Sequence, residues 1–275
     1  MSAVRRHPLI TFFVLTYAIS WVGLPLYAAG VWPIPFLATG PLIAALIVIP
    51  LTQGRAGLRE LGSRMIRWQV GWIWWALAIG LPLGVHLVTA GLNVAAGAGV
   101  PSLAFGSVTT FLLMFAVRMV NPLDGPLGEE PGWRGFALPG LQSTLSPLVS
   151  TLILAVLITG WHLPLFFLEE GGLQPSFIVT ALLSTVAVTF WYNWLFNRTG
   201  GSVLMTLVAH STQGIVQTNA FWAAEAAATR VVLLDTVVWC VVAIGLVIFD
   251  WRFWRGPGPA PATVQPAYEG ESRVR

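Results

Sequence analysis

The chain is divided into apolar stretches, most of them long enough to cross a bilayer, which takes about 20 residues of helix. Seven stretches have a suitable length and composition, namely 10–30, 34–52, 70–92, 103–121, 146–166, 176–196 and 229–250, and an eighth, 202–222, is apolar but interrupted by polar side chains. Backbone groups in lipid must form their hydrogen bonds within their own segment. The stretches therefore predict an all-α, polytopic transmembrane helix bundle.

The amino-acid composition also indicates that the chain lies in a lipid bilayer. Hydrophobic residues make up 56% of the 275 positions and charged residues only 9%, which is too few to cover the surface of a soluble domain. We therefore expect membrane lipid as the surrounding partner, and a net charge of +3 indicates no nucleic-acid partner. The single cysteine, Cys240, excludes an internal disulfide and a cysteine-based zinc cluster. Nothing in the sequence indicates an oligomeric state.

Three parts of the chain are expected. Residues 1–120 hold amino-terminal transmembrane helices and an arginine-rich segment, 53–69, which has the pattern of an amphipathic helix on the cytoplasmic surface or of an ordinary basic loop. Residues 121–252 hold the charged motifs, and 253–275 form a disordered tail. The positive-inside rule places the amino terminus in the cytoplasm. All basic residues are arginine, as base composition in a bacterium can produce, so we expect a bacterial cell membrane.

A short stretch, 128–142, leaves two topologies open. If it does not cross the membrane, the chain has eight spans and both termini lie in the cytoplasm, which satisfies the charge rule. If it crosses, the chain has nine spans and the carboxy terminus lies outside. The nine-span arrangement is the one that places Glu129 and His162 at the same depth in the membrane.

Charged residues gather in this short stretch. An ionisable group in mid-membrane costs about 3 kcal/mol or more, so its presence indicates function. Glu130 and Arg134 are four positions apart and can pair on one face of a helix, which turns Glu129 away by about 100°. Glu129 is then free to act as a general base.

Two histidines belong to the same predicted site. A chain reversal at 143–147 makes the stretches before and after it antiparallel, which brings His162 to the level of the glutamates. In the eighth stretch, His210, Gln213, Gly214 and Gln217 lie along one helical face, and a polar face must point into the bundle.

Structural explanations compete with this site. The glutamates can form a purely structural ion-pair network, and either histidine alone is better explained by an interhelical hydrogen bond. Their combination favours a functional site. His86, Arg118 and Asp235 are solitary in the sequence and are assigned structural roles. The polarity of a membrane interface suffices to explain Asn193 and Asn197, and a role in the site is the alternative for them.

Three motifs resemble those of a known family. Residues 129–136 read Glu-Glu-Pro-Gly-Trp-Arg-Gly-Phe, residues 161–164 read Trp-His-Leu-Pro, and His210 follows in a late span. This set resembles the CPBP family of intramembrane proteases, the CAAX-processing and bacteriocin-processing group that includes type II CAAX prenyl endopeptidases. The resemblance covers roughly 120–250. It implies a hydrolase that cleaves a peptide bond of a membrane-associated or lipidated substrate.

The family pattern is E-E-x-x-x-R, then F-x-x-x-H, then H-x-x-x-N or D. Glu129, Glu130 and Arg134 match the first part, His162 matches the second with Ile158 at the phenylalanine position, and His210 begins the third. The last position is Gly214, which has no side chain, so we expect the amide of Gln213 to replace it. The resemblance implies that Glu129 and His162 activate water, that His210 and an amide stabilise the oxyanion, and that Arg134 holds Glu130.

Two questions stay open at this point. Glu129, His162 and His210 also form an acceptable ligand set for Zn²⁺ or another divalent metal, although metal-independent activation of water is slightly favoured and no H-E-x-x-H helix is present. The rival functions are a catalytically inactive family member, a scaffold and proton-coupled transport. Transport is disfavoured because the sequence shows no inverted repeat. A prenylated carboxy terminus, a bacteriocin leader and a membrane-protein tail are equally suitable substrates.

Overall fold

The computed structural model describes residues 3–99, 107–168, 175–215 and 225–257, and every regular element in these ranges is a helix. In chain order they are α1 (Ala3–Arg6), α2 (Pro8–Trp21), α3 (Gly23–Ala28), α4 (Gly40–Thr52), α5 (Gly54–Met65), α6 (Trp72–Ala95), α7 (Val108–Val120), α8 (Pro126–Gly132), the π-helical turn η1 (Trp133–Ala137), α9 (Leu138–Gln142), α10 (Pro147–Leu168), α11 (Pro175–Arg198), α12 (Val203–Ile215), α13 (Glu225–Phe249) and α14 (Trp251–Arg255). The predicted helical membrane bundle is confirmed.

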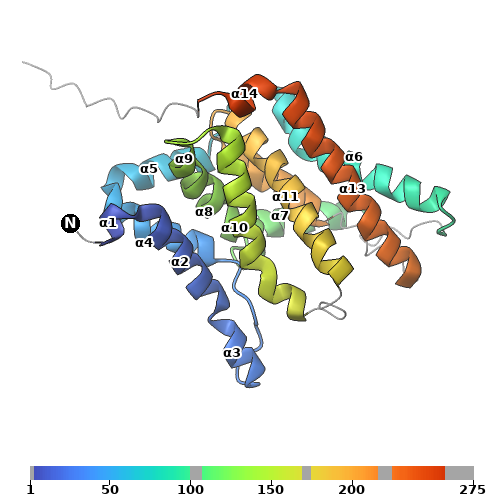
Figure 1. Cartoon of the computed structure of the whole chain (residues 1–275), viewed down its shortest axis with the longest axis horizontal. Helices are drawn as coiled ribbons and strands as arrows, with labels where there is room; N and C mark the ends of the chain where they lie inside the picture. The colour runs from blue at the N-terminus through green and yellow to red at the C-terminus, as the bar shows by residue number, and fades with distance from the viewer. Residues whose placement is uncertain (1–2, 100–106, 169–174, 216–224, 258–275) are drawn as a thin grey trace, which may run out of the picture.

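Five helices are long and apolar enough to cross a membrane. They are Pro8–Ala28, Trp72–Ala95, Pro147–Leu165, Ile178–Arg198 and Thr229–Phe249, while the apolar helices α4 and α7 are shorter. Figure 1 shows the long helices α10, α11 and α13 side by side, with α2 and α3 at one edge of the bundle. The bundle therefore combines full-length spans with shorter helices packed against them.

Two predicted spans begin later than expected, and a third is only partly described. The stretch predicted at 34–52 becomes helical only at Gly40, because Pro33 and Pro35 disfavour helical backbone in the residues before them. The helix predicted at 103–121 begins at Val108 in the described residues. The stretch 202–222 is helical from Val203 to Ile215, and Gln217 lies outside the described residues.

The surface helix and the tail were predicted from composition. Residues 54–65 of the predicted 53–69 segment form α5, and Leu61 on its inner side is buried against Gly135 of η1. The first residues of the predicted tail 253–275 are helical, since α14 runs to Arg255 and buries Trp254; residues from 258 onward lie outside the described part.

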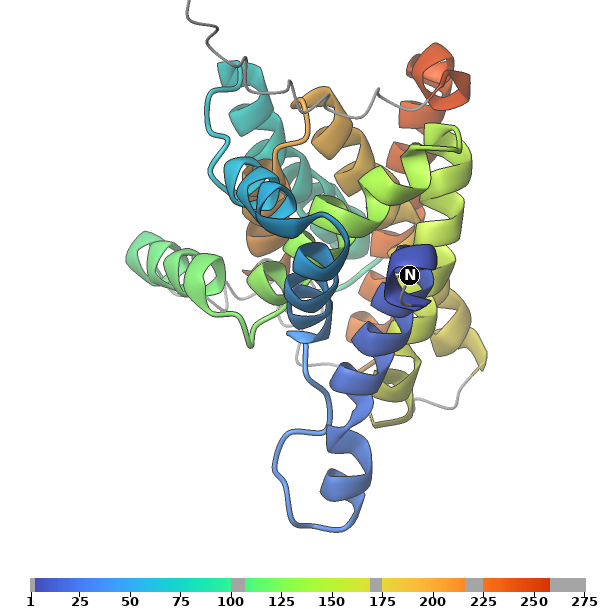
Figure 2. The ribbon, with the colours of Figure 1, turned by 90° about the vertical axis from the view of Figure 1, so that its left-hand side faces the viewer.

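Two hydrophobic clusters build the core. The first joins side chains of α2, α4, α5 and η1 to those of α10 and α12, so it includes residues from both predicted segments, 1–120 and 121–252. The second joins α6, α11, α12 and α13. Figure 2 shows α7 projecting from the side of the bundle. The short helix α8 and η1 contact α12, so the charged motifs lie where the two halves of the core meet.

Candidate active site

Two glycines let α8 approach the beginning of α4 closely. A Cβ on Gly128 would lie 2.6 Å from the carbonyl oxygen of Ala38, and a Cβ on Gly132 would lie 2.5 Å from the carbonyl oxygen of Pro41. Only residues without a side chain permit such contact between helix backbones. This approach fixes the depth at which the intervening glutamates Glu129 and Glu130 enter the bundle.

The helix widens into a π turn directly after the glutamates. Pro139 has no N–H to donate to the carbonyl of Gly135 four residues earlier, and Arg64 Nη1 of α5 lies 3.4 Å from that oxygen instead. Within this turn Trp133 is fully buried and makes edge contacts with Phe12 and Trp161, at ring-centroid distances of 5.6 Å and 5.5 Å. A π turn is often found at a functional site, and here it is held by aromatic packing.

Glu130 is the centre of a buried charged network. Its Oε1 accepts a hydrogen bond from Arg134 Nη1 at 3.0 Å and lies 2.9 Å from Nδ1 of His210, and the Glu130 side chain is 0% exposed. The predicted Glu130–Arg134 pair is confirmed. The contact with Glu130 also fixes the ring of His210, so that its other nitrogen, Nε2, points away from the pair.

Tyr192 and Asn193 on α11 complete this network, and the sequence did not single out Tyr192. Asn193 is fully buried, and its Oδ1 accepts a hydrogen bond from Arg134 Nε at 3.1 Å, so it belongs to this network, the alternative to interface polarity that the sequence left open. The ring of Tyr192 stacks on His210 at 5.3 Å and lies 5.0 Å from the Arg134 guanidinium carbon. The available signal was the adjacency of two polar residues within an apolar stretch that must hide its polar face.

Gln213 does not face the site as a free amide. Its Oε1 accepts a hydrogen bond from the hydroxyl of Tyr192 at 2.5 Å. The amide nitrogen remains able to donate, but the side chain is already held by the group that stacks on His210.

Glu129 and His210 face one small space. The position that a Cβ on Gly125 would occupy lies 3.2 Å from Glu129 Oε1 and 3.5 Å from His210 Nε2. Glu129 is 7% exposed, and no ion pair or side-chain hydrogen bond joins it to another residue in the described ranges. Gly125 itself has φ +32°, a backbone conformation that side chains resist, so this residue keeps the space open.

One ring nitrogen of His162 is held by the backbone and the other is free. Its Nδ1 lies 2.9 Å from the carbonyl oxygen of Ile158, one helical turn earlier, so Nδ1 carries the proton and Nε2 is free to accept one. Phe36 stacks on the ring at 6.4 Å with an angle of 20° between the planes. The preceding residue, Trp161, packs on Trp133 of η1 at 5.5 Å, so this part of α10 lies against the turn that follows the glutamates.

A metal site requires at least three ligand side chains that converge on one ion. Among the described residues, no three side chains of His, Cys, Asp or Glu lie close enough together to hold one ion. The set considered for Zn²⁺, formed by Glu129, His162 and His210, therefore does not make a preformed three-ligand cage in this arrangement.

Three residues that are solitary in the sequence have charged partners in the structure. His86 Nδ1 on α6 lies 2.9 Å from Asp235 Oδ1 on α13, and Thr89 donates to the same oxygen at 3.3 Å. Arg118 Nη1 at the end of α7 lies 2.9 Å from Asp124 Oδ1. The first group joins two spans away from the glutamates, whereas the second lies beside Gly125.

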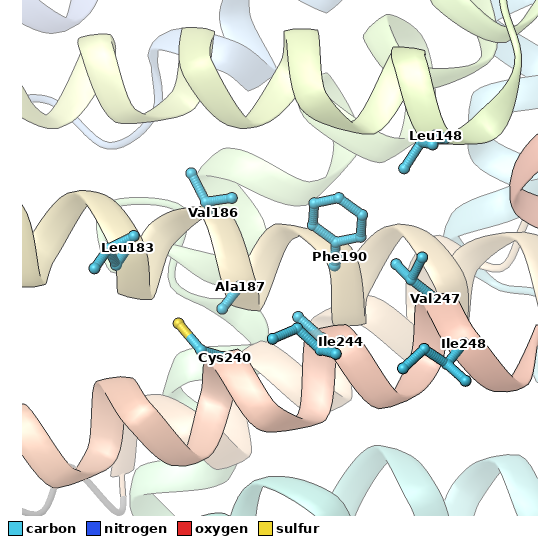
Figure 3. Close-up of a pocket in the computed structure, with 10 residues that line it drawn as sticks. Leu148, Leu183, Val186, Ala187, Phe190, Cys240, Ile244, Val247 and Ile248 are labelled. Atoms are coloured by element: carbon cyan, nitrogen blue, oxygen red, sulfur yellow. The ribbon is translucent and has the colours of Figure 1, made fainter. Parts of the chain in front are cut away.

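A separate apolar cavity opens between α10, α11 and α13. It has a volume of about 350 Å³, and Figure 3 shows its lining, which consists of aliphatic side chains together with Phe190 and Cys240. None of the predicted site residues lines it, and several lining residues such as Ile248 are largely exposed toward the surroundings of the bundle. It is a lipid-facing hollow and not the site of the charged motifs.

Comparison with known proteins covers the part of the chain that carries the site. Residues 107–216 match the sequence model of the family described as "Type II CAAX prenyl endopeptidase Rce1-like". The chain is also 22% identical over 176 residues to "CAAX prenyl protease 2" of Methanococcus maripaludis, which covers 62% of this chain and 63% of that relative. The match therefore spans less than two thirds of the relative's length. The resemblance indicated by the three motifs is confirmed.

Proposed function

Since residues 107–216 are Rce1-like, we propose that this chain is an intramembrane endopeptidase that hydrolyses a peptide bond of a membrane-associated or lipidated polypeptide. The observation that carries the proposal is the shared space at Gly125, onto which a carboxylate oxygen of Glu129 and Nε2 of His210 both open. A carboxylate without a competing partner and a histidine held in one orientation beside it provide the base and the donor that amide hydrolysis needs.

In the proposed reaction, Glu129 takes a proton from water while the water oxygen attacks the carbonyl carbon of the scissile bond. His162, whose Nε2 is free, accepts a hydrogen bond from the same water and orients it. Glu129 then passes the proton to the leaving nitrogen as the C–N bond breaks. The products are a carboxylic acid and an amine, which exchange the second proton of the water to become a carboxylate and an ammonium group, and no other reactant is required.

His210 stabilises the negative charge that develops on the carbonyl oxygen. With a proton on each ring nitrogen, it donates one to Glu130 through Nδ1 and directs the other from Nε2 toward the space at Gly125. Glu130 compensates the charge of the imidazolium, as a buried carboxylate does for a catalytic histidine. Arg134 and Tyr192 position this pair and do not touch the substrate.

The test uses the purified chain in liposomes with a fluorogenic peptide that ends in a lipidated or strongly apolar segment. Glu129→Gln and His162→Gln each remove one proposed role with little change in volume, and loss of a general base lowers kcat by about 100-fold or more. The matched controls are Glu60→Gln in α5 and His7→Gln before α2, which leave the rate unchanged. Cleavage by both site variants at the parental rate refutes the proposal.

A further inference from the structure

Arg118 fills the space that a side chain at Gly214 would need. A Cβ on Gly214 would lie 2.2 Å from Nη2, 2.5 Å from Cζ and 2.9 Å from Nε of Arg118. Real Cβ atoms essentially never approach other atoms so closely. The guanidinium of α7 and a side chain at position 214 of α12 are therefore mutually exclusive, and the glycine is what admits the arginine.

Position 214 is a site position by its geometry. It follows His210 by four residues on α12, so the two lie on the same face, one helical turn apart. Position 214 is therefore one of the neighbours of the proposed oxyanion donor on this face of the helix. In the proposed reaction, a donor at this position can reach the carbonyl oxygen that His210 contacts.

The guanidinium is held by the residue next to Gly125. Asp124 lies 2.9 Å from Arg118 Nη1, and Asp124 directly precedes Gly125 in the chain. The Arg118 side chain is 19% exposed, and its Nε is buried without a hydrogen-bond partner among the described residues. Asp124 thus orients one part of the guanidinium while the Nε–H group remains unused.

We infer that Arg118 supplies the second oxyanion donor of the site, in the place left empty by Gly214. The inference rests on the proposed function. As the carbonyl oxygen gains negative charge, unused N–H groups of the guanidinium donate hydrogen bonds to it; no proton is transferred, because arginine stays protonated in proteins. The interaction strengthens as charge develops, so it acts on kcat more than on KM.

The experiment removes the proposed donor at Arg118 of α7 and provides another at position 214 of α12. Removing one oxyanion donor lowers kcat by about 100-fold or more, which is the effect expected for Arg118→Ala with KM nearly unchanged. Gly214→Asn alone places a side chain on the guanidinium and also lowers kcat. Arg118→Ala combined with Gly214→Asn vacates that space, provides an amide donor from position 214, and recovers at least about tenfold over Arg118→Ala.

A control variant tests whether loss of any Arg–Asp pair lowers kcat. Arg198→Ala breaks a different Arg–Asp pair, with Asp250, and leaves kcat unchanged. If Arg118→Ala unfolds in detergent, Arg118→Gln, which keeps a donor toward Asp124, replaces it in the series. Parental kcat in the Arg118 variant, or no recovery in the double variant, overturns the inference while the proposed function stands. A parent chain that cleaves no substrate overturns both.

Discussion

The buried pair Glu130–Arg134 makes a prediction about stability that can be worked from its geometry. Arg134 donates to Glu130 at 3.0 Å and to Asn193 at 3.1 Å, and the Glu130 side chain has no exposed area. In Arg134→Met the helix propensity is preserved, since methionine and arginine rank alike. What is lost is the permanent cation, so Glu130 becomes a buried carboxylate without its arginine partner.

Breaking a buried pair by removing one partner costs about 3–5 kcal/mol, here because the buried carboxylate of Glu130 loses its permanently charged partner. Neutralising the other partner as well, in Glu130→Gln with Arg134→Met, removes that charge and should return the cost to about 1–2 kcal/mol, which is a usual cost for a lost hydrogen bond in the interior. The expected coupling between the two positions is therefore about 2–3 kcal/mol.

The assay is reversible unfolding in mixed micelles with increasing dodecyl sulfate, followed by tryptophan fluorescence. Arg198→Met is the matched control, because its partner Asp250 is part of a partly exposed pair whose loss costs less than about 1 kcal/mol. Equal losses for Arg134→Met in the parent and in the Glu130→Gln background, with coupling under about 0.5 kcal/mol, would refute the buried-charge reasoning.

Three further results are expected. Gly132→Ala drives a Cβ to 2.5 Å from Pro41 and lowers unfolding free energy by about 1–3 kcal/mol in the same micelle titration, whereas Gly62→Ala, which meets nothing within 4 Å, does not lower it. Asp235→Asn weakens the contact with His86 between α6 and α13, which lowers stability by about 0.6–1.7 kcal/mol while kcat per folded molecule stays parental. Incubation of the active protein with 1,10-phenanthroline leaves the cleavage rate within about twofold, since proton transfer to Glu129 needs no metal; loss of activity that added Zn²⁺ restores contradicts this mechanism.

The sequence was sufficient for the elements whose causes are local. Hydropathy over about 20 residues located the long spans to within a few positions, because length and apolarity are properties of each segment alone. The Glu130–Arg134 pair followed from a separation of four residues on a helix. The start of the second span was wrong where the two prolines at 33 and 35 outweighed apolarity.

The contacts between helices could not be predicted in the same way. The adjacency of Tyr192 and Asn193 indicated that this part of α11 faces the interior, but an almost wholly apolar helix carries no periodic signal for its partner, so the sequence did not indicate Arg134 as the group that they contact. His86 and Asp235 illustrate a missed argument. Each is ionisable within a span and needs a partner there, and the cost of leaving either alone in lipid was a reason to pair them.

The missing side chain at Gly214 is also explained by a contact between helices. A motif specifies a residue at a sequence position, but a transition state is stabilised by a donor atom at a point in space. Arg118 reaches that point from α7, and the absence of a Cβ on α12 is the condition for its entry. Gly214 and Arg118 then form one feature, because the glycine leaves room for the arginine and the arginine replaces the donor that the glycine lacks. Substitution at either position alone should lower kcat, and substitution of both, with Asn at 214, should restore part of it.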